Sequence, residues 1–320
     1  MKLKEIFDKA VKTALKNDPR SASIIKKDLN LLKKSYGQMT SLEKSNFDKE
    51  SLIHPYDDSR ILYGAPDKEI KTIMVGIDID TSELLLADRF RQNGVNIDLV
   101  ISHHPLGRGL TQLDKVMILQ PRLWQSLGFD ETLAREIIRD RMEEVARSLS
   151  GINYTRVVDF ARIMDIPLIC LHTAADNCVS AFLSKLFIKE KPDKLEDVLN
   201  LCYKIPEYSY AAKSGMGPYI LVGDKKKKAG KILVDMTGGA NGPDRIFSRL
   251  SQSGIQTIVG MHIKDSGYKI VKSEFLNYIV AGHMSSDTLG VNLLLDAVDP
   301  ANKLTIIECS GFKRYIRKNG

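Results

Sequence analysis

Apolar residues in the first fifty positions recur at helical spacing. Residues 6–15 place their apolar side chains three or four positions apart, and residues 24–36 repeat the pattern. Such spacing predicts two amphipathic helices. Turn-forming residues between 57 and 66 then break the pattern. We therefore expect a helical extension over residues 1–50, ahead of the main fold.

From residue 71 onwards, short β-branched runs alternate with helical patterns. Residues 72–77 and 97–101 are typical of strands, and the helix between them begins near Thr81 and ends near Asn93. A strand, a helix and a second strand with short connections indicate a parallel pair in an α/β protein. Further strand-like runs cover residues 166–171, 218–222, 231–236, 255–259, 277–281 and 304–307.

The long segment between the second and third of these strands is helical in pattern, with Arg and Glu four positions apart over residues 131–148. We predict an α/β fold of two lobes, with largely parallel or mixed sheets flanked by helices. The first lobe is expected to combine residues 51–112 with 270–320. Residues 113–165 are expected to be a helical insertion, and residues 166–269 the second lobe.

Composition places the chain among ordinary globular proteins. Of its 320 residues, 43% are hydrophobic and 27% are charged, which excludes wholesale disorder. No apolar run approaches the ~20 residues that cross a bilayer, and the charged N-terminus lacks an apolar signal core, so we expect a cytoplasmic protein. Four cysteines without close spacing are expected to be buried thiols.

The net charge of +7 comes partly from short lysine runs such as residues 225–228. This balance is compatible with nucleic acid or with an anionic metabolite as a partner. A solvated basic surface is the simpler interpretation, because no aromatic residues interleave with these runs. Nucleic-acid binding is therefore the least favoured function.

Candidate chemistry gathers where three predicted strands end. The side chains are His103, His104, His172, Asp176, His283 and Asp287. Because ligands of open α/β sheets bind beyond the carboxyl ends of the strands, we expect these segments to converge on one crevice. Spacing of four residues puts His283 and Asp287 on one helix face.

Imidazole and carboxylate without thiolate suit two divalent ions such as Zn, Fe or Mn. Two such ions roughly 3.5–4 Å apart convert water into a nucleophile near neutral pH. Each residue also has an ordinary interpretation: Asp176 as a helix cap, Asp287 as a partner of a helix dipole, and His54 and His262 as satisfied surface or core residues. For Asp176 and Asp287, the joint placement at strand ends favours the metal interpretation over these alternatives.

A glycine-rich loop at residues 237–242 lies between a predicted strand and a predicted helix. Its amides could hold a phosphate, but the spacing matches neither the dinucleotide motif nor the P-loop. A tight turn that requires positive φ is an equally good interpretation.

Three segments, taken in order, resemble the signature motifs of the NGG-one-interacting-factor-three family. They are residues 101–106 (ISHHPL), 172–176 (HTAAD) and 281–287 (AGHMSSD). Members of this family are also labelled dinuclear metal-centre proteins or GTP cyclohydrolase I type 2 homologues. The similarity covers roughly residues 50–310.

The resemblance implies a two-domain α/β protein that assembles into a ring-like homohexamer. It also implies a set of metal ligands, namely His103, His104, Asp176, His283 and Asp287. His172 would lie beside the metals as a catalytic group that orients or transfers protons. This chain departs from the family at Asp287, where glutamate is usual, and in the long segment between the first two motifs.

We therefore expect a metal-dependent hydrolase that acts on a small anionic substrate, with nucleotides among the candidates and metal-bound water as the nucleophile. Basic side chains such as Arg108 or Lys264 would neutralise the substrate. The alternative is a non-catalytic, metal-binding oligomeric scaffold or regulator.

Overall fold

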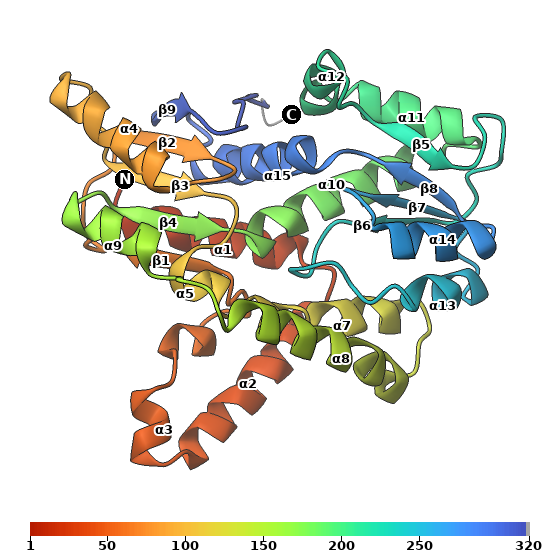
Figure 1. The fold of residues 1–320 in the computed structure, drawn as a ribbon, viewed down its shortest axis with the longest axis horizontal. Helices are drawn as coiled ribbons and strands as arrows, with labels where there is room; N and C mark the ends of the chain where they lie inside the picture. Colours follow the sequence, from red (N-terminus) through yellow and green to blue (C-terminus); the bar gives the residue numbers. More distant parts are fainter. Residues whose placement is uncertain (318–320) are drawn as a thin grey trace.

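The computed structural model describes residues 1–317. The last residues of the segment 270–320 that was assigned to the first predicted lobe, 318–320, lie outside the described residues. Two sheets stand apart from each other, with helices on their faces and between them (Figure 1). The prediction of an α/β fold with two lobes is confirmed.

The first sheet has the strand order β1-β4-β3-β2-β9. Its strands are β1 (Ser59–Tyr63), β2 (Thr72–Gly76), β3 (Leu99–Ser102), β4 (Leu168–Leu171) and β9 (Thr305–Glu308). Only β1, at one edge, pairs antiparallel with its neighbour. Every residue of β3 and β4 is buried, as expected for parallel strands covered on both faces.

The second sheet has the order β5-β8-β7-β6. Its strands are β5 (Tyr219–Val222), β6 (Ile232–Asp235), β7 (Thr257–Gly260) and β8 (Asn277–Val280). Again the first strand of the set is the antiparallel edge strand. The predicted domain boundaries remain a prediction, and in the structure β4 lies in the first sheet and β8 in the second.

The helices that connect the strands of the first sheet include those of the predicted insertion. In order they are α4 (Thr81–Gln92), α5 (Gly107–Leu110), α6 (Leu113–Val116), α7 (Leu119–Ser126), α8 (Glu131–Leu149) and α9 (Arg156–Ile163). Those of the second part are α11 (Leu195–Tyr203), α12 (Pro206–Ala212), α13 (Ile246–Gln252) and α14 (Asp265–Ser273). Among residues 1–317, no helix combines the length and the apolar character needed to span a bilayer.

Two long helices, α10 (Thr173–Glu190) and α15 (His283–Val298), pack against each other between the sheets (Figure 1). They approach closely, because a Cβ atom at Gly290 would lie 2.6 Å from the carbonyl oxygen of Ala175. Only glycine allows this distance, so the contact fixes the spacing of the two N-terminal turns.

The N-terminal residues are helical, as predicted, but they play two different roles. Helix α1 (Leu3–Asn17) buries its apolar face against α10 and α15 and is part of the core. Helices α2 (Ala22–Gln38) and α3 (Ser41–Ser45) project away from the body (Figure 1), and in α2 only Ile25 is buried. A short 3₁₀ helix, η1 (Lys49–Leu52), leads back to β1.

Candidate metal centre

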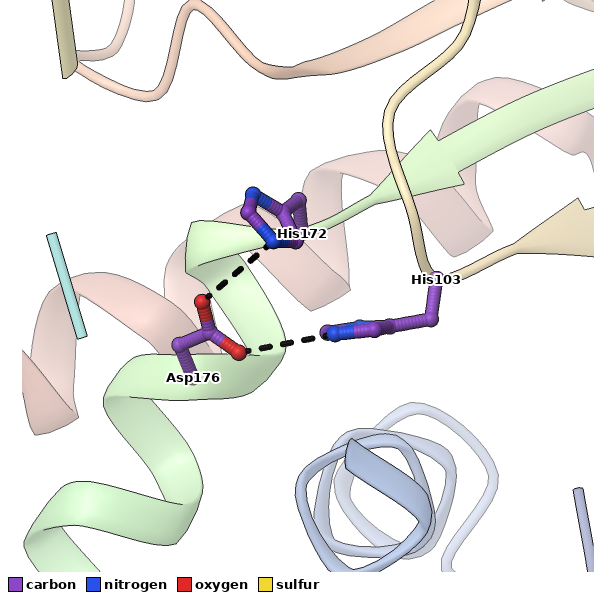
Figure 2. A group of neighbouring side chains, drawn as sticks. All are labelled: His103, His172 and Asp176. Atoms are coloured by element: carbon purple, nitrogen blue, oxygen red, sulfur yellow. Dashed lines mark ion pairs between the residues drawn. The ribbon is translucent and has the colours of Figure 1, made fainter. Parts of the chain in front are cut away.

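The carboxyl ends of β3 and β4 meet the N-terminal turns of α10 and α15. His103 directly follows β3, and His172 is the residue before α10. Asp176 lies in the first turn of α10, and its carboxylate points toward both histidines (Figure 2). Asp287 lies one turn into α15. Three separate parts of the chain therefore supply one cluster.

His103 is 1% exposed and is held in one orientation. Its Nδ1 lies 3.2 Å from the carbonyl oxygen of Leu171, so Nδ1 carries the hydrogen and donates it. The other ring nitrogen, Nε2, then presents a lone pair. It lies 3.6 Å from Oδ1 of Asp176 and 3.4 Å from Oδ1 of Asp287.

His104 is oriented in the same manner from the other side. Its Nδ1 donates to Oδ1 of Asp78 at 2.6 Å, and its Nε2 lies 3.5 Å from Oδ2 of Asp287. His283 brings its Nε2 to 3.4 Å from the same Oδ2. With a side chain that is 41% exposed, His283 stands on the open side of the cluster.

His172 repeats this arrangement a third time. Its Nδ1 lies 2.8 Å from Oδ2 of Asp58, a fully buried carboxylate that also accepts the hydroxyl of Thr173 at 2.6 Å. Its Nε2 faces Oδ2 of Asp176 at 3.8 Å. A histidine fixed through Nδ1 by a carboxylate or carbonyl, with Nε2 free, is the usual arrangement around a bound metal.

The two carboxylates of the cluster have opposite electrostatic surroundings. Burial raises the pKa of Asp176 to about 8. Burial would raise the pKa of Asp287 too, but His103, His104 and His283 hold it well below its usual range. Burial also lowers the pKa of His103, which favours the neutral imidazole that a metal requires.

Several atoms in the middle of the cluster are buried without a hydrogen-bond partner among residues 1–317: Nε2 of His103, Oδ1 of Asp176, and both oxygens of Asp287. Leaving such atoms unpaired is costly, on the order of 1–3 kcal/mol each. Divalent cations held by His103 and the two carboxylates would satisfy these atoms. The donor set, imidazole with carboxylate, suits Zn, Fe or Mn.

Within residues 1–317, two groups have ligand atoms within 4.8 Å of one another. They are His103, His172 and Asp176, and His103, His104 and Asp287. These buried groups can bind a metal ion. His103 belongs to both groups, and the single lone pair of its Nε2 can serve either position but only one ion at a time.

The structure therefore brings together all six side chains that the sequence singled out. Which of them bind metal stays a prediction, and His172 is placed as a ligand could be, besides its predicted catalytic role. Asp287, although shorter than the glutamate that the resemblance leads one to expect, lies within 3.4–3.5 Å of the imidazoles of His103, His104 and His283.

Sequence reasoning missed two carboxylates and the position of one histidine. Asp78 follows β2, so strand-end reasoning applied to that strand would have found it, whereas Asp58 precedes the antiparallel edge strand β1 and gives no such signal. The ring of His262 lies 4.8 Å from the ring of His283. His262 thus borders the cluster, whereas His54 is a buried core residue, as expected.

The glycine-rich loop is a tight turn. Gly238 and Gly239 have φ values of 101° and 79°, which other residues rarely adopt. The side-chain amide of Gln120 in α7 donates to the carbonyl oxygens of Gly238 and Ala240 at 2.9 and 2.7 Å. This interaction ties the predicted insertion to the second sheet.

Comparison with known proteins supports the resemblance drawn from the motifs. No family model and no curated protein sequence matches the chain. Among solved structures, a NIF3 superfamily protein from Sphaerobacter thermophilus is 26% identical with a TM-score of 0.70, covering 80% of this chain and 92% of that one. Reduced HcgD from Methanocaldococcus jannaschii shares the fold, at 17% identity and a TM-score of 0.52, covering 84% and 97%. Together with the three ordered motifs, the likeness to the Sphaerobacter thermophilus protein supports the resemblance of this chain to the NIF3 superfamily.

Proposed function

We propose that this protein binds two divalent metal ions and acts as a metal-dependent hydrolase on a small anionic substrate. The observation that carries the proposal is the set of buried, unpartnered ligand atoms on His103, Asp176 and Asp287. Bound ions would supply Lewis acidity toward an anionic group and activate water. The residues proposed to hold them are His103, His104, Asp176, His283 and Asp287.

A pocket on the open side of the cluster supports access by a small molecule. Its lining includes His172, Asp176, His283 and Asp287. Lys264 lines the same pocket and could neutralise an anionic group there. Arg108, the other cation considered from the sequence, is paired with Glu50 at 2.6 Å, so we leave it out of the proposed site.

The proton-transfer role proposed for His172 rests on its position. Asp58 fixes the ring through Nδ1, while Nε2 faces both the cluster and the pocket. Burial would lower the pKa of His172, but Asp176 and Asp58 outweigh this effect and raise it. Such a group can hold a proton for transfer to a leaving group.

The test is metal analysis of anaerobically purified protein, followed by turnover assays on nucleotides, phosphoesters and cyclic amides. We expect two metal ions per chain, and activity that is lost in Asp287→Asn. Asp8→Asn, an exposed control on α1, should keep both. Metal binding without turnover of any substrate would favour the non-catalytic scaffold, and absence of metal would contradict both functions.

We also propose that the protein is a homo-oligomer, with the hexamer of the family resemblance as the expected size. Light scattering combined with size-exclusion chromatography tests this proposal. A monomer at micromolar concentration would contradict it.

A further inference from the structure

Strand β6 forms an open edge of the second sheet, because it stands last in the order β5-β8-β7-β6 and pairs with β7 alone. Just before the strand, the carbonyl oxygen of Lys231 accepts the amides of Gln256 and Thr257 on the β7 side, at 3.0 and 3.2 Å. Successive residues of a strand direct their backbone groups to opposite sides, so Ile232 and Val234 direct theirs away from β7. Within residues 1–317 no other strand pairs with this edge, and its donors and acceptors are open to another chain.

A groove of about 830 Å³ runs along this edge. Residues 230–234 form one wall, and the other walls come from α7, α10 and the chain around the end of α1. The helices contribute the apolar side chains of Leu123, Leu127, Phe187 and Ile188. Ile188 is 73% exposed, although it is large and apolar. An open strand edge beside exposed apolar side chains is the arrangement to which an extended peptide adds as a further strand.

The rim of the groove carries positive charge. Four exposed lysines line it, and none of them forms an ion pair within residues 1–317: Lys16, Lys185, Lys191 and Lys231. The one acidic residue of the lining is Asp18, whose side chain is buried and paired with Arg20 at 2.8 Å. The groove therefore favours an acidic occupant, since complementary charge steers and orients association.

The same charges argue against a second copy of this chain at the edge. If two β6 edges paired about a two-fold axis, the four lysines of one subunit would face those of the other, and like charges brought together weaken association. Nucleic acid would neutralise the lysines, but it would not complete the backbone hydrogen bonds of Ile232 and Val234. An acidic peptide satisfies both requirements.

We propose that this groove is a docking site for an extended acidic segment of a partner protein, which adds along β6 as a fifth strand of the second sheet. Its acidic side chains would contact the lysine rim, and the apolar side chains alternating with them would pack against α7 and α10. The four residues of β6 offer about 13 Å of edge to such a segment. Docking requires neither bound metal nor turnover, so it is independent of the proposed hydrolase.

The test uses the full chain and a short fluorescein-labelled peptide of alternating glutamate and valine, with binding followed by fluorescence anisotropy. Two further versions of the peptide are N-methylated at every second amide, in the two alternative registers. We expect saturable binding of the unmodified peptide. The version whose methyl groups face β6 should bind about tenfold to hundredfold more weakly, because its hydrogen bonds to the edge are lost. No binding of the acidic peptide, or equal affinity of all three versions, would overturn the proposal.

Charge reversal tests the lysine rim. Lys185→Glu combined with Lys231→Glu should weaken peptide binding by at least about tenfold. Lys189→Glu is the matched control, because Lys189 lies on the same helix α10 and is exposed but does not line the groove. It should keep the affinity. An equal loss in the control would reduce the effect to net charge and overturn the proposal.

A substitution in β6 tests the strand edge. Ile232→Pro removes an outward N–H and leaves the hydrogen bonds to β7 in place, since an edge strand tolerates proline there. The variant should lose peptide binding and keep its metal content. Should it fail to fold, the lysine variants decide. An oligonucleotide that binds more tightly than the peptide and is indifferent to Ile232→Pro would assign the groove to nucleic acid instead. A dimer that Ile232→Pro abolishes would assign it to a second copy.

Discussion

The two halves of the molecule share a strand order but not a chemistry. The order β1-β4-β3-β2 of the first sheet is repeated as β5-β8-β7-β6 in the second. Each set begins with an antiparallel edge strand and ends in a long central helix, α10 or α15. The first half contributes four of the six clustered side chains, and the second contributes His283 and Asp287. The two halves thus repeat one strand order, but they contribute unequal numbers of side chains to the candidate metal centre.

Equivalent positions make the difference concrete. His103 and His104 follow β3, whereas Met261 and His262 follow β7. His262 keeps an imidazole at the place that corresponds to His104, beside the cluster but outside both potential ligand groups. The connection between the third and fourth strands differs as well, since the first half inserts α5 to α9 where the second has only α14.

The largest effect is expected from substituting His103, because the equivalent residue in the second half, Met261, offers no imidazole. His103 is central to both potential ligand groups, so His103→Ala should lower the affinity for at least one of the two metal ions by more than about hundredfold. Isothermal titration with Zn or Mn measures this change. Met261→Ala, the equivalent substitution in the second half, should retain both ions. Two tightly bound ions in folded His103→Ala would contradict the proposed centre.

A smaller effect is expected where the two halves touch. In Gly290→Ala the new Cβ would lie 2.6 Å from the backbone oxygen of Ala175, forcing α15 away from α10. Overpacking of this kind costs about 1–3 kcal/mol, which urea unfolding measures. Metal affinity should fall too, because Asp287 moves with α15. Unchanged stability would show that the helices can separate freely.

The third prediction concerns a supporting carboxylate. Asp78→Asn keeps a hydrogen-bond acceptor for His104 but removes its charge, so metal affinity should drop by about tenfold. The exposed position of Asp78 should leave stability unaffected. Thr237→Val changes the corresponding residue after β6 and should leave metal affinity as it was. A drop of equal size in both variants would mean that the loss is not specific to the first half.

The smallest effect lies outside both halves, on the projecting α2. Gly37 is helical and a Cβ atom there would meet nothing within 4 Å. Gly37→Ala should therefore stabilise the protein, by roughly 0.5–1 kcal/mol, as glycine weakens helix interiors. Thermal unfolding provides the measurement. Destabilisation would indicate that α2 has a contact in the assembled protein that it lacks in the single chain.

Local patterns predicted much of this fold, because buried parallel strands are short apolar runs and ligand residues directly follow them. They did not predict β1, since Arg60 in that strand is polar in sequence. In the structure its guanidinium is fully buried and paired with Asp48 and Asp57. An edge strand whose arginine is buried against carboxylates of the preceding segment has no local apolar signature. Asp58, next to it, was read as a turn residue for the same reason.

Tertiary pairing also lies beyond local patterns. Nothing within residues 304–307 indicates that they form β9, which pairs with β2 at the edge of the sheet opposite β1. The position of His262 beside His283 likewise depends on how β7 and α15 pack, and its sequence neighbours carry no sign of it. The six ligand candidates were found because strand ends converge whatever the strand order.

The pairing of β9 with β2 has a consequence for the time course of synthesis. Thr72 lies opposite Thr305, so the first sheet cannot be completed until the chain has been made as far as β9. The second sheet draws all four strands from residues 219–280 and can assemble earlier from closer contacts. His283 and Asp287 are also synthesised after the other histidines of the cluster, which lie between residues 103 and 172. We therefore expect metal to enter only after residues 283–308 have been made, and the second lobe to serve as the surface on which the first is completed.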